Sequence, residues 1–265
     1  MPNTTKAHVS RREMLRRQQE AELRKQRTIK IVLIAVAVVV VIAIIAVIIA
    51  VVQKKKYDAN VNGDPNSQIN PPDLTSDGSA IIANPAAKGN ALTIDIYEDF
   101  QCPICKEVED KFGPAFDQIV ASNQAVVQYH VMTFLDQNLG NDSSSRAAIG
   151  ATCADTIGKF DAYHDAVFEN QPEEGTGYTD QQLGTTFAQD AGITGDDLTK
   201  FQQCYNNRQT SQVVQTMNNN NLKVVQGTPD VYANGKQIDL NTLMNLSGND
   251  ANTLLTALKQ TAGIS

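Results

Sequence analysis

An uninterrupted apolar run from Ile31 to Val52 limits what this chain can fold into more than any other feature. Its 22 residues would make a helix about 33 Å long, close to the roughly 30 Å thickness of a bilayer core. A helix that packs on the core of a globular domain would show a polar face, and this run has none. We therefore expect residues 31–52 to form a single transmembrane anchor.

The sequence around this run predicts an uncleaved anchor whose N-terminus stays in the cytoplasm. The run is longer than the apolar part of a signal peptide, has no Ala-x-Ala site near its end, and is followed by Lys54, Lys55 and Lys56. Nine Lys or Arg precede it in the basic tail 1–30, so the positive-inside rule leaves residues after 56 facing outward from the cell membrane. A competing interpretation is that SRREMLR at 10–16 resembles a twin-arginine export signal.

The charges are divided unevenly along the chain. Residues 1–56 have a net charge of +9, whereas residues 57–265 have a net charge of −16. Because binding to phosphates needs a basic surface, this balance argues against nucleic acid as a partner of the main domain. The basic residues before the anchor are better suited to contact with anionic lipid.

Beyond the anchor, the sequence predicts a linker followed by an α/β domain. Residues 53–79 are rich in Asn, Asp and Pro without apolar periodicity, so we expect a flexible linker. We place the domain at 80–265, with a helical insertion at about 141–222, because strand-like and helix-like patterns alternate along it. These patterns are strands at 80–83, 92–97 and 125–134, helices from 143 to 221, a hairpin at 229–238 and a last helix at 250–262.

The stretch YEDFQCPICK at 97–106 joins the second strand to a helix and places Cys102 and Cys105 on the first turn of that helix. Pro103 falls where a missing backbone N–H costs nothing. A thiol at a helix N-terminus has its thiolate stabilised by free N–H groups and the helix dipole, which lowers its pKa below about 8.5. By itself, this pattern fits a redox pair, a metal site or a structural bridge, although two-residue spacing makes a strained and reducible link rather than a useful structural one.

In this order, the motifs of residues 80–262 resemble those of DsbA-like proteins with a thioredoxin fold, in particular the membrane-anchored extracytoplasmic forms of Gram-positive bacteria. The motifs are YEDFQCPIC at 97–105, RAA at 146–148, KF at 159–160 with YH at 163–164, Phe168 with QP at 171–172, and GTP at 227–229 with NGK at 234–236. The resemblance implies a thioredoxin fold with a helical insertion.

The resemblance also implies roles for individual residues. Cys102 would be the exposed nucleophile and Cys105 the buried resolving thiol. A cis bond between Thr228 and Pro229 would expose backbone that pairs with an extended substrate segment, and Pro103 and Ile104 would complete the substrate-binding surface. Without the resemblance, Thr228-Pro229 is an ordinary turn sequence, since most X-Pro bonds are trans.

Two positions depart from the pattern of this family. Many thioredoxin-fold enzymes have a buried acid six residues before the nucleophile, but Ile96 occupies that position here. Glu98 and Asp99 are nearer to the cysteines, and we expect them to be solvated acids, which leaves the proton route open. Ile104 has no polar group where other members have a histidine, so we expect a milder oxidant than the strongest members. His130 and His164 are expected only to pack.

Cys153 and Cys204 lie in the helical part, and pairing the close cysteines leaves these two for each other. A bridge that closes a loop of about 52 residues would stabilise the fold by roughly 4 kcal/mol and would suit an oxidising compartment. Free buried thiols or a second redox pair remain alternatives. A zinc site is disfavoured because this pair lacks ligand spacing and a nearby histidine. No metal and no organic cofactor is implied.

These observations lead to one main hypothesis and two alternatives. The chain would be an extracytoplasmic thiol-disulfide oxidoreductase that introduces disulfides into reduced exported proteins through Cys102 and Cys105. By resemblance alone, a membrane quinone reductase would reoxidise it. The first alternative is a disulfide reductase or isomerase, although no dimerisation domain that would favour an isomerase is evident. The second is a non-enzymatic envelope protein whose Cys-x-x-Cys holds copper or a client protein.

Overall fold

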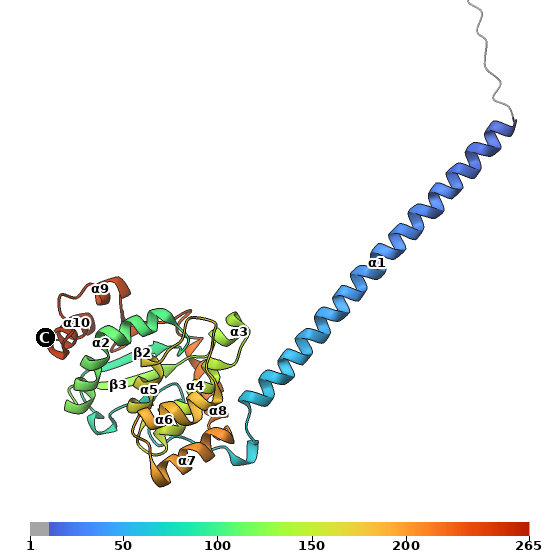
Figure 1. The fold of residues 1–265 in the computed structure, drawn as a ribbon. Helices are drawn as coiled ribbons and strands as arrows, with labels where there is room; N and C mark the ends of the chain where they lie inside the picture. The colour runs from blue at the N-terminus through green and yellow to red at the C-terminus, as the bar shows by residue number, and fades with distance from the viewer. Residues whose placement is uncertain (1–10, 265) are drawn as a thin grey trace, which may run out of the picture. The chain divides into compact units, whose positions relative to one another are not determined.

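The structure is a computed structural model that describes residues 11–264, so the first ten residues of the predicted basic tail lie outside the described residues. The chain forms two compact units, one up to Lys56 and one from Tyr57. Helix α1 runs from Arg11 to Val61 and contains the apolar run (Figure 1). By length and composition, it is the one helix among the described residues that is able to cross a membrane.

The second unit is built on a five-stranded mixed sheet with the order β1-β3-β2-β4-β5. The central strand β2 is parallel to β3 and antiparallel to β4, and Ile96 lies between Tyr129 and Val231. The strands are β1 (Ile81–Ile82), β2 (Thr93–Glu98), β3 (Val126–Val131), β4 (Asp230–Ala233) and β5 (Lys236–Ile238).

Helices α2 (Pro103–Ser122) and α10 (Ala251–Ala262) pack against each other beside the sheet. The helical spacing of Phe112, Phe116 and Ile119 puts these side chains in the core. A short helix, α9 (Leu240–Met244), precedes α10. Because only four residues separate the end of β2 from the start of α2, the two cysteines lie at the junction of the central strand and this helix.

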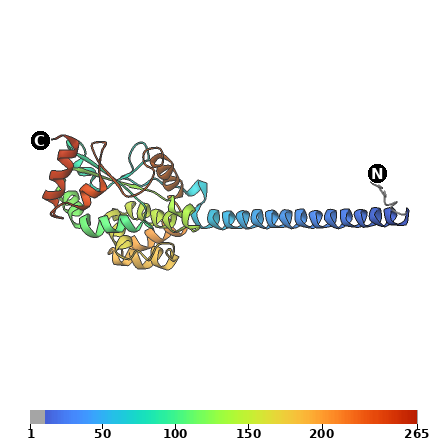
Figure 2. The ribbon, with the colours of Figure 1, turned by 90° about the horizontal axis from the view of Figure 1, so that it is seen from above.

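The chain between β3 and β4 is helical, which confirms the predicted α/β architecture with a helical insertion. In Figure 2, the yellow helices of this part of the chain lie on the same side of the strands as α2. All residues of α4 are buried, and its small side chains allow close packing against α5. The elements are α3 (Leu135–Leu139), α4 (Ser143–Asp155), α5 (Phe160–Glu169), the π-helical turn Gln182–Thr186, α6 (Phe187–Asp190), α7 (Gly195–Asn206) and α8 (Ser211–Asn221).

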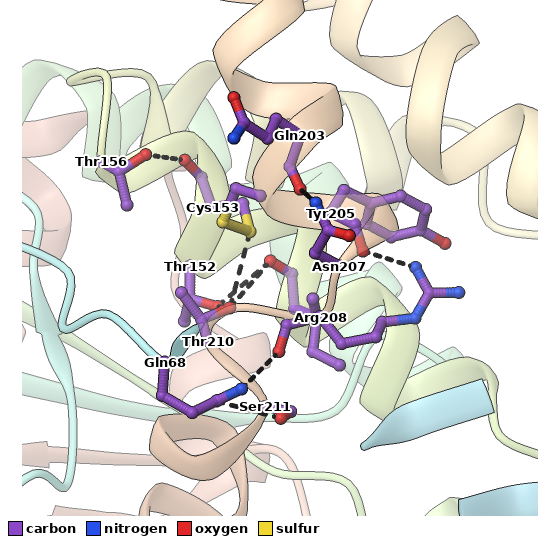
Figure 3. Close-up of a disulfide and its surroundings, with 12 residues drawn as sticks. Gln68, Thr152, Cys153, Thr156, Gln203, Tyr205, Asn207, Arg208, Thr210 and Ser211 are labelled. Carbon is purple, nitrogen blue, oxygen red and sulfur yellow. Dashed lines mark hydrogen bonds between the residues drawn. A yellow bond between two sulfur atoms is a disulfide. The ribbon is translucent and has the colours of Figure 1, made fainter. Parts of the chain in front are cut away.

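A disulfide between Cys153 of α4 and Cys204 of α7 connects two helices of the insertion, with 5.8 Å between the Cα atoms. Figure 3 shows the buried Thr210 hydroxyl beside it, which accepts a hydrogen bond of 2.8 Å from the Thr152 hydroxyl. The structure therefore contains the pairing that the sequence led us to expect.

Residues 57–79, which we name the docked segment, are held on the domain, so the expectation of a flexible linker is wrong for this part. The Tyr57 hydroxyl lies 2.9 Å from that of Ser145. Gln68 Nε2 donates to the carbonyl of Arg208 at 3.2 Å and Gln68 Oε1 accepts from the Ser211 hydroxyl at 3.1 Å, as Figure 3 shows in part. Polar side chains make these contacts, which is why the composition resembled that of a disordered linker.

Candidate active site

Cys102 is the N-cap residue of α2. It has an extended backbone, and its sulfur accepts a hydrogen bond from the backbone N–H of Cys105 at 3.4 Å. Pro103 follows at the first position of the helix, where its fixed φ suits the turn. Both cysteines are thiols and both are buried in this structure, so the expectation that Cys102 is exposed is wrong. The sulfur of Cys102 therefore lies at the positive end of a helix, where a thiolate is favoured.

The two thiols differ in acidity. A hydrogen bond from Cys105 is the main cause that lowers the pKa of Cys102 to about 6; burial opposes it, and Thr228 and the backbone of Ile104 add to it. Complete burial is the main cause that raises the pKa of Cys105 well above its ordinary value. At neutral pH, Cys102 is thus the thiolate and the better nucleophile, while Cys105 keeps its proton.

The loop Thr228-Pro229 faces Cys102 because it leads directly into β4, whose first residue pairs with Tyr97 near the end of β2. The peptide bond between Thr228 and Pro229 is cis. In its protonated form, the Cys102 thiol donates a hydrogen bond to the carbonyl of Thr228 at 3.5 Å. The structure thus brings together the cysteines and this loop, and Ile104, which is 44% exposed, lies on the outer side of the first turn of α2.

Side chains of the insertion hold the loop that leads into the cysteines, a role that the sequence did not indicate. The carbonyl of Phe100 accepts hydrogen bonds from Gln171 Nε2 at 2.9 Å and from the Tyr178 hydroxyl at 2.6 Å. Gln171 Nε2 also donates to the carbonyl of Cys102 at 3.1 Å. Gln171 was noted only as part of a family motif, and no local pattern singled out Tyr178.

Asp99 is buried, contrary to the expectation of a solvated acid. Its carboxylate accepts hydrogen bonds from the Ser144 hydroxyl, the backbone N–H of Gln101 and that of Leu135. Burial raises the pKa of Asp99 to about 8, although these hydrogen bonds act in the opposite direction. The turn after β2 points this side chain into the insertion, where its polar partners replace water.

Glu98 is also buried, so the expectation of a solvated acid is wrong for this residue as well. Strand alternation puts it on the same face as Ile96, and it meets His164 of α5 with 2.7 Å between Oε1 and Nε2. Burial opposes a charge on His164, but Glu98 and Asp165 raise its pKa well above the ordinary value. Because side chains alternate along a strand, position 98 lies on the same face as the buried Ile96. That pattern could have identified Glu98 as buried.

His130 lies on the opposite face of the sheet. One ring nitrogen is 3.1 Å from Asp95 and the other is 3.2 Å from Asn221, and the ring stacks on Tyr97. Asp95 therefore faces away from Ile96, as the alternation of side chains along a strand requires. These contacts agree with the expectation that His130 packs.

Comparisons with known proteins agree with this geometry. A family model described as thioredoxin matches residues 75–248. The reduced disulfide bond oxidoreductase DsbG of Mycobacterium tuberculosis is 25% identical, with a TM-score of 0.54 over 71% of this chain and 89% of that chain. Oxidised DsbA of the same organism is also 25% identical, with a TM-score of 0.54 over 69% of this chain and 93% of that chain.

A more distant similarity concerns the fold alone. MdbA, a thiol-disulfide oxidoreductase from Actinomyces oris, is 17% identical with a TM-score of 0.57, over 78% of this chain and 98% of that chain. A comparison with curated protein sequences found no match.

Proposed function

Because this chain belongs to the thioredoxin family and is a DsbA-like thiol-disulfide oxidoreductase, we propose that it introduces disulfides into exported proteins through Cys102 and Cys105. The observation that carries this direction is the pKa of Cys102, lowered to about 6 by its hydrogen bonds. A stable thiolate favours the reduced form of the pair, so the disulfide form is a ready oxidant.

The proposed reaction consists of two thiol-disulfide exchanges. A substrate thiolate attacks the sulfur of Cys102 in the oxidised pair, and Cys105 leaves and takes up a proton, since its burial favours the neutral thiol. A second substrate thiolate then attacks the substrate sulfur of the mixed disulfide and releases Cys102 as a thiolate. The substrate loses two electrons, which the pair gains. A membrane quinone reductase would then reoxidise the pair.

The loop beside Cys102 offers a place for the substrate chain. An extended segment would pair with the backbone at Thr228, next to Pro229, and reach the sulfur of Cys102 from there. Pro103 and the exposed Ile104 would supply an apolar contact beside it. Since backbone pairing does not depend on sequence, this mode of binding suits an enzyme with many substrates.

We further propose that residues 31–52 anchor the chain as a single uncleaved span, with the domain outside the cytoplasm. The excess of Lys and Arg before the span supports this orientation, and the Cys153–Cys204 disulfide suits an oxidising compartment. Protease added to intact cells without a wall should digest the domain and leave the tail 1–30 protected. Protection of the domain would contradict this topology.

The oxidation of a reduced, unfolded ribonuclease by the preoxidised full-length chain tests the proposed activity. Cys102→Ser should abolish oxidation, whereas Cys105→Ser, treated with an activated mixed-disulfide reagent, should keep a covalent adduct on Cys102. A variant with both Cys153→Ala and Cys204→Ala is the matched control and should retain activity. Activity that persists in Cys102→Ser would rule out the mechanism.

The reduction potential of the pair decides between oxidase and reductase. A value well above that of a typical cytosolic reductase, which is about −270 mV, supports the proposal, and a value below it supports the reductase alternative. Copper retained after purification without chelator, together with no oxidation of the ribonuclease, would favour the envelope-binding alternative.

A further inference from the structure

Three buried residues with metal-binding side chains meet beneath the active-site helix. Glu98 comes from β2, Glu109 from α2 and His164 from α5. Their exposed fractions are 1%, 8% and 0%. One ligand atom of each, a carboxylate oxygen or a ring nitrogen, lies within 4.8 Å of the other two. The strand, the active-site helix and the insertion therefore converge on one small polar volume.

Two oxygen atoms in this volume have no hydrogen-bond partner. They are Oε2 of Glu98 and Oε1 of Glu109, and both atoms are buried. A buried carboxylate oxygen without a donor loses its hydration and gains no hydrogen bond in return, and this is most unfavourable when the group is charged. His164 compensates one oxygen of Glu98, at 2.7 Å. The two oxygens without a partner would be stabilised by a bound proton or a bound cation.

A cavity of about 210 Å³ opens beside this group, and Glu109 lines it. None of the residues that line the cavity is basic, and five of them are acidic: Glu109, Asp110, Asp117, Asp165 and Glu169. A concave site lined by one sign of charge concentrates ions of the opposite sign. The electrostatics of the cavity therefore favour the entry of a cation toward Glu109.

The imidazole of His164 is held in the orientation that a metal ligand needs. Its Nδ1 lies 3.1 Å from a carboxylate oxygen of Asp165, and its Nε2 faces the glutamates. Rings of Tyr129, Phe168 and Phe100 pack around it with centroids 4.4 Å, 5.0 Å and 5.7 Å away. Histidines that bind metals usually donate their second N–H to a carboxylate, and an apolar shell limits access by solvent.

We propose that Glu98, Glu109 and His164 bind a divalent transition-metal ion of the Zn²⁺ type. One imidazole nitrogen and two carboxylate oxygens suit such an ion better than Ca²⁺ or Mg²⁺, which prefer oxygen ligands alone. Tetrahedral bonds of about 2.0 Å place ligand atoms about 3.3 Å apart, which small side-chain movements achieve here. Since Glu109 lines the acidic cavity, water from there could serve as a fourth ligand.

This site is separate from the cysteines and goes beyond the redox function. It differs from the sequence-based expectation that no metal is implied; the argument against zinc concerned only Cys153 and Cys204. The ion would join β2, α2 and α5 and so fix the insertion to the helix that begins at Cys102. We therefore assign it a structural role.

Zinc titration of the full-length chain in detergent tests the site. The chain is made without a histidine tag, stripped with chelator, and fully oxidised so that no thiolate can bind metal. Isothermal titration with ZnCl₂ should show one saturable site per chain. Glu109→Gln should weaken zinc binding at least 100-fold. Asp165→Asn removes the negative charge beside His164 Nδ1 and in the cavity, and should weaken it about 10-fold.

Glu107→Gln is the matched control, because it makes the same substitution on the exposed side of α2 and should change zinc affinity less than twofold. Co²⁺ in place of zinc should give visible d–d bands without thiolate charge transfer, and these bands should be lost in Glu109→Gln. If that variant does not fold, Asp165→Asn, whose side chain is 38% exposed, carries the decision.

Three results would overturn the proposal. They are no saturable zinc binding by the oxidised chain, an affinity that neither Glu109→Gln nor Asp165→Asn changes, and displacement of zinc by an equal concentration of Ca²⁺ or Mg²⁺. The first two would mean that the group holds only protons. None of these measurements uses disulfide transfer, so the redox function can stand or fall separately.

Discussion

At the scale of single residues, Thr228 distinguishes this site from a bare helix N-terminus. Its hydroxyl oxygen is buried without a conventional hydrogen-bond partner. Hydrogen bonding from Thr228 nevertheless contributes to the lowered pKa of Cys102 and acts in the same direction on Cys105. The hydroxyl thus has a use when Cys102 is ionised, because a thiolate accepts the hydrogen bond that this group would otherwise lack.

Replacing Thr228 with Val should raise the pKa of Cys102 above about 6 while keeping the shape of the loop. Only the thiolate reacts with iodoacetamide, so the alkylation rate of the reduced protein should rise with pH, with a midpoint near pH 6. A rise of about one pKa unit would slow alkylation roughly fivefold at pH 6 and leave it unchanged at pH 9. The midpoint is measured with quenched mass spectrometry. An unchanged midpoint would mean that the hydroxyl does not contact the thiolate.

The two-residue spacing of Cys102 and Cys105 made this pair predictable from the sequence. The surroundings of Glu98 and Asp99 were not predictable in this way. Glu98 shares the parity of Ile96, but its partner His164 lies 66 residues further along the chain. The donor to Asp99 from the insertion, Ser144, is 45 residues away. The sequence shows that Glu98 and Asp99 stand at the end of a strand. Their hydrogen-bond partners are distant in sequence, so only the folded structure shows that both acids can be buried.

At the scale of elements, the insertion is stabilised by its disulfide. Replacing Cys153 and Cys204 together with Ala should lower the free energy of unfolding by about 4 kcal/mol, because the open chain regains the entropy of a long loop. For a domain of this size that corresponds to roughly 10 °C in Tm. Urea unfolding under oxidising conditions measures the loss. If reductant lowers the stability of the double variant as much as that of the wild type, the bridge is not the source of the effect.

Asp155, at the C-terminal end of α4, should make stability depend on pH. Burial raises its pKa to about 7, while a hydrogen bond from the backbone N–H of Asp73 at 3.1 Å opposes this. The unfolded carboxyl titrates near 3.9, so the folded state binds more protons between about pH 4 and pH 7. This contribution to stability is therefore full below pH 4 and is lost as the pH rises to 7.

Asp155→Asn should remove this slope, since the amide oxygen still accepts the hydrogen bond from Asp73 and carries no charge. At pH 8 the variant should be more stable than the wild type by on the order of 1 kcal/mol or more. Urea midpoints from pH 4 to pH 8 measure the difference. Asp190→Asn, at the exposed end of α6, is the control and should leave the slope unchanged. Parallel curves for Asp155→Asn and the wild type would refute the assignment.

At the scale of the whole molecule, the docked segment extends the folded unit beyond the domain that the sequence outlined. Val61, which is 1% exposed, packs with the core. Leu74 forms a β-bridge with Ile81. A chain that starts at Tyr57 should therefore fold, whereas one that starts at Ala80 loses these contacts and uncovers Asp155.

We expect the fragment 80–265 to be less stable than 57–265 by at least about 2 kcal/mol, roughly the value of burying Val61 and one further apolar contact. The fragment 69–265, which keeps Leu74 but loses Tyr57 and Gln68, should lie between them. Thermal unfolding followed by circular dichroism ranks the three fragments. Equal stability of 57–265 and 80–265 would show that the docked segment adds nothing.

The fold as a whole was more predictable than its boundaries. Alternating and helical periodicity gave the order of the strands and helices, and Asn234-Gly235 marked the hairpin between β4 and β5. The sequence did not reveal the docked segment, because hydrogen bonds of backbone and side-chain amides hold it on the domain. Such contacts produce no periodic pattern of apolar residues. Periodicity likewise does not show the π-helical turn at 182–186, because it does not reveal a change of helix type.

The dependence of the active-site loop on the insertion limits how far the Cys-Pro-Ile-Cys motif can be transplanted. A minimal thioredoxin scaffold that carried residues 97–105 would lack Gln171 and Tyr178, so the carbonyls of Phe100 and Cys102 would lose the donors that they have here. Asp99 would lose Ser144 in the same way. Transfer of this active site to another scaffold therefore requires transfer of the insertion as well, since residues of the insertion hold the loop that contains the tetrapeptide.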